Sequence, residues 1–194
     1  MSRRPLSYWW LKLVAMACLT FGRRERALEI FDDMLRIAPE DAYALASQVH
    51  VLAQMGRSAK ALAVAQALVQ AHPQGSAGHW FNLAFLLQEA GRLGEAEAAF
   101  RQAVQIDEEL DRAWYGLGLV LIALQRFDEA VEALKRNTEL QPMSPYGWYQ
   151  LARVHVDRQE PDEAAKIIRR LKGFEPKVAA QLERETGLRV AGPG

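Results

Sequence analysis

Apolar residues recur along this chain with a period near 3.6, in pairs of segments separated by short polar turns such as AGRLGE and LQRFDE. That period places the apolar side chains of each segment on one face of an α-helix. Two such helices joined by a few residues form a hairpin in which their apolar faces meet. The pattern therefore predicts an all-α chain built from helix hairpins.

The predicted hairpins repeat at a fixed interval. An alanine recurs every 34 or 35 residues, at Ala27, Ala61, Ala96, Ala130 and Ala164. A glycine or glutamine stands five residues before each alanine. Four second helices are followed by a proline, which lacks the N–H needed to continue a helix: Pro39, Pro73, Pro142 and Pro176. Five repeats fit this grid, at residues 8–41, 42–76, 77–110, 111–144 and 145–176.

Small residues predict where the two helices of each hairpin cross. The recurring alanine supplies the second helix's side of the crossing. The matching residues of the first helices are small in four of five repeats: Ala15, Val49, Ala84, Gly118 and Ala152. A larger side chain at either place would hold the two helices apart.

These residues also carry a family resemblance. Tryptophan, leucine, glycine, alanine and proline at these positions, best seen in Trp114, Leu117, Gly118, Ala130 and Pro142, resemble the tetratricopeptide repeat (TPR) family. The resemblance covers residues 8–176. It implies a right-handed α-solenoid of about five helix hairpins.

Some positions depart from the family pattern or lie outside it. Gln48, Asn137 and His155 stand where the family usually has apolar residues, so looser packing is expected around them. A repeat stack leaves the apolar face of its last hairpin open, and a helix over residues 177–188, ended by Gly187, is expected to cap it. Residues 1–7 are expected to form an N-terminal extension and residues 189–194 a flexible tail.

Composition and charge narrow the function classes. Lysine plus arginine equals aspartate plus glutamate, 24 of each, so no net field attracts the chain to nucleic acid, which is not expected as a partner. No run approaches the ~20 apolar residues of a membrane span. Cys18 is the only cysteine, which excludes an internal disulfide and fits a cytoplasmic location. The repeat phase predicts that Cys18 is a buried residue of the first helix.

The N-terminal sequence leaves one alternative open. The segment MSRRPLSYWWLKLVAMAC resembles a bacterial lipoprotein signal, in which Cys18 would be acylated and anchor the chain to the envelope. Lys12 interrupts its apolar run, and Ala15 and Met16 match the signal poorly.

The sequence shows no catalytic constellation. The four histidines, His50, His72, His79 and His155, form no zinc-binding motif with cysteine or carboxylate. His72 and His79 flank the turn PQGSAG and could approach each other. A glycine-rich phosphate loop is absent. We therefore expect a protein that is not an enzyme and that uses no metal and no cofactor.

The family resemblance implies a binding surface. In TPR proteins the first helices line a concave groove, which the second, fifth, sixth, ninth, twelfth and thirteenth residues of each repeat face. The candidate peptide-binding residues are then Tyr43, His50, Phe81, Asn82, Phe85, Arg112, Tyr115, Leu119, Tyr146, Tyr149 and Arg153. In the first repeat the same positions hold Trp9, Lys12, Leu13 and Met16.

The residues of this groove indicate which ligand to expect. TPR domains that hold the C-terminal carboxylate of chaperones use lysine, asparagine and arginine at five positions. Only Asn82 and Arg112 match them here, whereas Ala46, His50 and Gly116 occupy the other three. The exposed aromatic residues instead predict an adaptor that binds an apolar peptide segment of a partner protein. The alternatives are a self-assembling, homo-oligomeric scaffold and an envelope-associated lipoprotein of pilus or secretion assembly.

Overall fold

A computed structural model describes residues 5–191, which contain eleven α-helices and no strand. The helices are α1 (Leu6–Thr20), α2 (Arg24–Ile37), α3 (Ala42–Gln54), α4 (Ser58–Ala71), α5 (Ala77–Glu89), α6 (Leu93–Ile106), α7 (Asp111–Ala123), α8 (Phe127–Leu140), α9 (Pro145–Asp157), α10 (Pro161–Phe174) and α11 (Pro176–Thr186). Four second helices end two residues before the prolines of the repeat grid.

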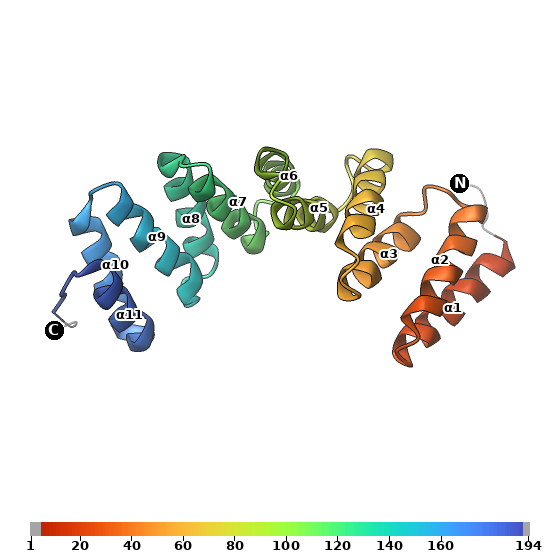
Figure 1. The fold of residues 1–194 in the computed structure, drawn as a ribbon, viewed down its shortest axis with the longest axis horizontal. Coiled ribbons are helices and arrows are strands. Elements are labelled where there is room, and N and C mark those ends of the chain that lie inside the picture. Colours follow the sequence, from red (N-terminus) through yellow and green to blue (C-terminus); the bar gives the residue numbers. More distant parts are fainter. Residues whose placement is uncertain (1–4, 192–194) are drawn as a thin grey trace. The chain divides into compact units, whose positions relative to one another are not determined.

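The helices pack into two units, Met1–Leu86 and Leu87–Gly194, whose boundary lies inside α5. In the first unit α1 packs on α2, α2 on α3, and α3 on α4; in the second, contacts run consecutively from α6 to α11. The hairpins α1/α2, α3/α4, α7/α8 and α9/α10 can be followed in Figure 1. Contacts that link each helix to its sequence neighbours are typical of a repeat protein.

The recurring small residues lie at the hairpin crossings, as the sequence predicts. All five recurring alanines are fully buried, with 0% exposure: Ala27, Ala61, Ala96, Ala130 and Ala164. On α7, a β carbon at Gly118 would lie 2.7 Å from Cγ of Leu134 on α8. The two backbones of this hairpin therefore approach too closely for any side chain at Gly118.

The turn inside each hairpin explains the glycine or glutamine that precedes each alanine. Gly22, Gly56 and Gly91 have φ angles of 71°, 70° and 72°, in the left-handed region that glycine enters without steric cost. Gln125 and Gln159 take the same conformation, with φ of 59° and 61°, although their β carbons disfavour it. The local backbone is thus the same in all five hairpins.

The recurring tryptophans hold the connection that precedes their helices. In three successive repeats the indole Nε1 donates a hydrogen bond to a main-chain oxygen six or seven residues earlier: Trp80 to Pro73 (3.0 Å), Trp114 to Glu108 (2.9 Å) and Trp148 to Pro142 (3.0 Å). Each bond joins a first helix to the residues that end the previous repeat. The periodic tryptophan therefore has a structural role.

The three polar residues that stand where the family usually has apolar ones are buried and hydrogen-bonded. Gln48, Asn137 and His155 are each less than 8% exposed. Their partners are the carboxylate of Asp32 (2.6 Å), the main-chain oxygen of Asp111 (2.9 Å) and the carboxylate of Glu160 (2.7 Å). The expectation of looser packing is therefore corrected, because hydrogen bonds replace the apolar contacts that the family has at these positions.

The C-terminal segment differs in part from its prediction. α11 begins and ends slightly earlier than the predicted helix 177–188, and Gly187 follows it with φ of 74°. Residues 189–194 were expected to form a flexible tail, but Val190 is buried against α10 and α11. Its N–H donates to Glu183 (2.8 Å) and its carbonyl oxygen accepts from Lys172. Residues 192–194 lie outside the described residues.

The N-terminal segment also differs from its prediction. Residues 1–4 of the predicted extension lie outside the described residues, and α1 begins at Leu6. Cys18 was expected to be buried and is only partly so. The physical reason is that α1 packs mainly against α2, so its side chains are covered from one side.

Candidate functional site

In the first unit, the predicted binding positions of α1 and α3 lie next to each other. The Lys12 ammonium lies 3.9 Å from the ring centroid of Tyr43 on α3 and 5.8 Å from that of Trp9 on its own helix. A cation over an aromatic face is attracted by the electrons of the ring. The two helices thus present one surface that is aromatic, carries a positive charge and leaves half of Trp9 exposed.

His50 lies one turn before the end of α3, in a polar environment. The amide nitrogen of Gln54 lies 2.8 Å from its Nε2, and the amide oxygen of Gln54 accepts a hydrogen bond from Arg24 (3.3 Å). This face therefore changes along α3 from the aromatic Tyr43 to a hydrogen-bonded polar end.

α5 carries three predicted site residues, which differ in exposure. The Phe85 side chain is 50% exposed and Asn82 is also exposed, whereas Phe81 is partly buried. Phe85 is therefore the ring of this helix that offers most apolar surface to a ligand.

In the second unit, the predicted residues of α7 are less accessible than the sequence suggests. Arg112 is exposed, but Tyr115 and Leu119 are partly buried. Tyr115 packs against the hydrophobic core formed by α8, α9, α10 and α11. Tyr146, at the start of α9, is 70% exposed. The ring of Tyr115 thus contributes to stability as well as to the predicted surface.

Further along α9, the capping helix contacts two predicted site residues. The hydroxyl of Tyr149 donates a 2.6 Å hydrogen bond to Glu185 of α11, and the Arg153 guanidinium lies 5.8 Å from the Tyr149 ring centroid. The bond to Glu185 and partial burial raise the pKa of Tyr149. Donation by Tyr149 and by Gln181 lowers the pKa of Glu185. α11 therefore occupies part of the predicted surface of the last repeat.

The structure thus brings some predicted residues into contact and leaves others separate. Tyr43 meets Lys12 of α1 and Phe31 of α2, and Tyr149 meets Arg153 on the same helix. The other candidates stand on the first helices α3, α5, α7 and α9, as the repeat phase predicts. Their shared use by one ligand stays a prediction.

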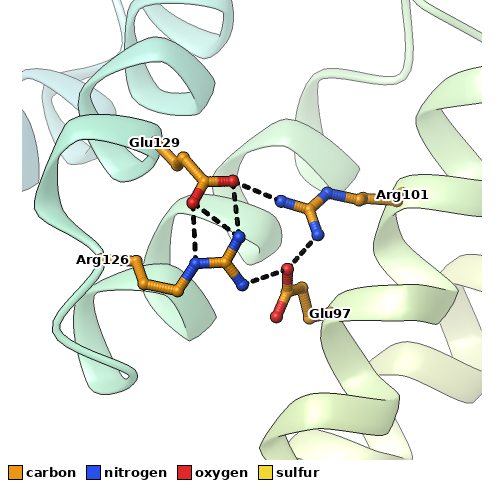
Figure 2. Close-up of polar contacts among 4 residues, drawn as sticks. All are labelled: Glu97, Arg101, Arg126 and Glu129. Carbon is orange, nitrogen blue, oxygen red and sulfur yellow. Dashed lines mark hydrogen bonds and ion pairs between the residues drawn. The ribbon is translucent and has the colours of Figure 1, made fainter.

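Sequence reasoning missed a charged network between α6 and α8. Glu97, which is 7% exposed, accepts hydrogen bonds from Arg101 and from Arg126 (2.6 Å). Glu129 accepts from the same two arginines, at 2.6 Å each. Figure 2 shows the four side chains as a closed ring of ion pairs. Because the four residues come from two repeats, the ring fixes one second helix against the next.

The network alters the titration of its members. Hydrogen bonds to Glu129 and then Glu97 raise the pKa of Arg126, and the bond from Arg126 is the largest cause of the lowered pKa of Glu129. A sequence signal was present, because an arginine stands just after the turn glycine or glutamine in four repeats: Arg23, Arg57, Arg92 and Arg126. Arg57 pairs in the same way with Glu25 of the preceding repeat.

Two open clefts lie between helices of adjacent repeats, one in each unit. One, of about 640 Å³, lies between α6, α7 and α8 and is lined by residues including Arg101, Trp114, Leu117, Glu132 and Arg136. The other, of about 440 Å³, lies between α2, α3 and α4. Both contain carboxylates and basic groups that form salt bridges to each other or to neighbours.

Within residues 5–191, no group of three or more histidine, cysteine, aspartate or glutamate side chains is placed to hold a metal ion. No helix of the same range is long and apolar enough to cross a bilayer.

The hairpin period, the buried small residues and the consecutive helix contacts define a helical-repeat protein of the solenoid class. The tetratricopeptide repeat family matches the sequence over residues 47–111, 87–148 and 145–170, more than half of the chain together. The chain therefore belongs to the tetratricopeptide repeat family, as its sequence predicts. Repeats of this family generally serve as interaction modules.

Known structures agree with this assignment. A crystal structure of MamA has 17% sequence identity and a TM-score of 0.81, and the match covers 95% of this chain and 97% of that one. MamA 41-end from Desulfovibrio magneticus RS-1 has 20% identity, a TM-score of 0.78, and coverage of 94% and 98%. YrrB, described as a TPR protein with an unusual peptide-binding site, has 18% identity, a TM-score of 0.78, and 88% coverage of each chain. No curated protein sequence matches the chain.

Proposed function

We propose that this protein is a non-enzymatic adaptor that binds an apolar peptide segment of a partner protein on its first helices. One observation carries the proposal. Among the large apolar side chains of residues 5–191 that are exposed, only Ile37 lies on a second helix. Five occupy positions that face the groove in the family: Trp9, Leu13, Met16, Phe85 and Tyr146.

The physical reason is the cost of leaving such residues in water. Each large apolar side chain gains about 1.5–3 kcal/mol when a ligand covers it fully. Aromatic side chains do this with little loss of conformational entropy, which is why they are frequent at the centres of binding surfaces. The peptide-binding site named for YrrB supports the same class of ligand, although the low identity carries over no residues.

The experiment compares capture by the full chain and by variants of its most exposed rings. Phe85→Ala and Tyr146→Ala should retain helical content and midpoint of unfolding, because both side chains are at least half exposed. Each should reduce, and together they should abolish, the capture of partner proteins from a lysate of the source organism. Met143→Ala is the matched control, since Met143 is 67% exposed but lies between α8 and α9.

If the double variant captures the same proteins as the parent chain, the first helices do not bind the partner and the proposal is wrong. Self-assembly is the second candidate function, and light scattering after size-exclusion chromatography measures it directly. A mass that stays at that of the monomer at all concentrations would exclude it.

A further inference from the structure

Half of the circumference of α1 is uncovered, and that half is almost entirely apolar. At 100° per residue the uncovered side of α1 holds Ala17, five large apolar residues and only two polar ones, Ser7 and Thr20. The large side chains on it are Leu6 (89% exposed), Trp9 (51%), Trp10 (68%), Leu13 (61%) and Met16 (49%), and Phe21 (78%) follows the helix. These six residues are here named the α1 apolar face.

The α1 apolar face is larger than an ordinary exposed patch. Its six side chains expose about as much surface as four complete side chains, on the order of 800 Å² at about 200 Å² each. The largest apolar patch of a typical monomer is about 300–600 Å². A surface of this size indicates that another molecule covers it.

The shape of the face does not suit one more helix of the repeat stack. At the third position of a repeat, α3, α7 and α9 have Ala44, Ala113 and Gly147, which are buried, and α5 has His79, which is partly buried. A β carbon on Gly147 would lie 2.1 Å from the Asn137 side-chain oxygen, so that contact leaves no space for a side chain. α1 has Trp10 at this position. A second copy would have to accommodate this indole, which is larger than any side chain at the same position of the other repeats.

The charges near the face are positive. Lys12 is the only charged residue of α1. In the sequence Arg3 and Arg4 precede the helix, and Arg23 and Arg24 follow it. The first acidic residue of the chain is Glu25, and it is paired with Arg57. An apolar helix face between basic residues is typical of segments that lie on anionic membranes.

We infer that the α1 apolar face binds the surface of a membrane that contains anionic phospholipids. Trp9, Leu13 and Met16 then contact lipid, and the later first helices, with Phe85 and Tyr146, are left for the peptide of the proposed function. Lipid chains adapt to an irregular apolar surface, so Trp10 is no obstacle to them. The indole rings of Trp9 and Trp10 suit the boundary between headgroups and chains, where tryptophan is enriched. Arg23 and Arg24, which follow the helix, are then close to the lipid phosphates. α1 lies along the membrane in this arrangement and does not cross it.

The test is sedimentation of the full chain with vesicles. One set contains phosphatidylcholine with about one third phosphatidylglycerol, and the other contains phosphatidylcholine alone. We expect binding to the mixed vesicles and at least about tenfold weaker binding to the neutral ones. Arg23→Glu with Arg24→Glu should lower binding to the mixed vesicles by at least about tenfold.

Two further variants test whether binding depends on the α1 apolar face or on exposed apolar side chains in general. Trp10→Ser removes a side chain that is 68% exposed and should abolish binding, while Met143→Ser removes one that is 67% exposed and should not change it. Leu13→Ser provides a second removal on the same face, and circular dichroism checks that each variant is folded. In the parent chain, mixed vesicles should protect tryptophan fluorescence from quenching by iodide.

Three results would overturn the inference. The first is that the parent chain stays in the supernatant with both kinds of vesicle. The second is that Trp10→Ser and Leu13→Ser, both folded, bind as well as the parent. The third is self-association, measured by light scattering, that Trp10→Ser abolishes while vesicles do not bind, because the face would then be a contact between copies of the chain.

Discussion

Gly116 of α7 lies directly against the ring of Phe100 on α6: a β carbon at Gly116 would stand 2.4 Å from Cζ of that ring. Phe100 is 1% exposed, so its ring has no free space to move into. The two helices belong to consecutive repeats, and this contact sets the distance between them. A glycine inside a helix, usually unfavourable, is required here by packing.

Gly116→Ala should therefore destabilise the protein. Overpacking of a closed core costs about 1–3 kcal/mol, and the better helix propensity of alanine offsets up to about 1 kcal/mol of it. Urea denaturation should show a lower midpoint. Gly94→Ala on α6 is the control, because a β carbon there meets nothing within 4 Å, and it should leave stability unchanged or raise it. A gain in both variants would contradict the close contact of Gly116 with Phe100.

The charged ring of Figure 2 provides a second prediction. Glu97→Gln removes a buried negative charge from between Arg101 and Arg126 and leaves both guanidinium groups with a weaker acceptor. Because the two arginines are more than one third exposed, water limits the loss to about 1–2 kcal/mol. Thermal unfolding measures it, and the loss should shrink at high salt.

The control for Glu97→Gln is a variant that breaks an ion pair on the surface of one helix. Glu29→Gln breaks the pair with Arg26 on α2, where both side chains are more than 60% exposed. Such pairs contribute little, so the melting temperature should barely change. Equal effects of the Glu97 and Glu29 substitutions would mean that the ring does not join the two repeats.

The contact of Gly116 with Phe100 and the ion pairs of Glu97 show which features of the fold the sequence does not predict. The period predicted the hairpins, their crossings and the turn residues, because these depend on local spacing and on the size of single residues. Gly116 was considered only as a mismatch to a carboxylate-binding position of the family, since spacing within one repeat does not show that its α carbon faces Phe100 of the previous one. The arginine period was visible, but Glu97 occurs once and could not be paired with Arg126 from the sequence alone.

The binding surface was less predictable than the fold for a related reason. The family phase predicts that Tyr115, the fifth residue of its repeat, and Phe85, the ninth, both face the groove, yet Tyr115 packs on a core while Phe85 is half exposed. Exposure depends on the neighbouring helices, which the phase does not specify. In the same way, only the structure shows that Glu185 of the cap is bonded to Tyr149.

The turn of the fourth repeat can be improved. Gln125 has a φ of 59°, and replacing it with glycine removes the conflict between its β carbon and the backbone. The higher entropy of glycine in the unfolded chain offsets part of this gain, so Gln125→Gly should stabilise by up to about 1 kcal/mol. The reverse change, Gly91→Gln, places a β carbon on a residue whose φ is 72°. That β carbon would meet nothing within 4 Å, so only the backbone conformation is unfavourable, and the variant protein should be less stable by a similar amount. Denaturation midpoints that do not move in opposite directions would contradict this explanation of the turns.

His79 makes the stability of the first unit depend on pH. Its Nδ1 is buried and has no hydrogen-bond partner among the described residues. Burial, and secondly the charge of His72, lower the pKa of His79 below its ordinary value of 6.5. The folded chain therefore binds fewer protons than the unfolded chain just below pH 6.5, so stability is retained above this pH and decreases as the pH falls.

The expected result is a urea midpoint that decreases between about pH 7 and pH 5, and decreases less in His79→Gln, which cannot be protonated in this range. Carboxylates such as Glu95 and Glu183, whose pKa values are lowered, lose their stabilising effect only at lower pH, so they do not mask the change. His50→Gln is the control, because His50 is exposed and its loss should preserve the pH dependence of the parent chain. Parallel pH profiles for the parent and His79→Gln would show that protonation of His79 is not linked to folding.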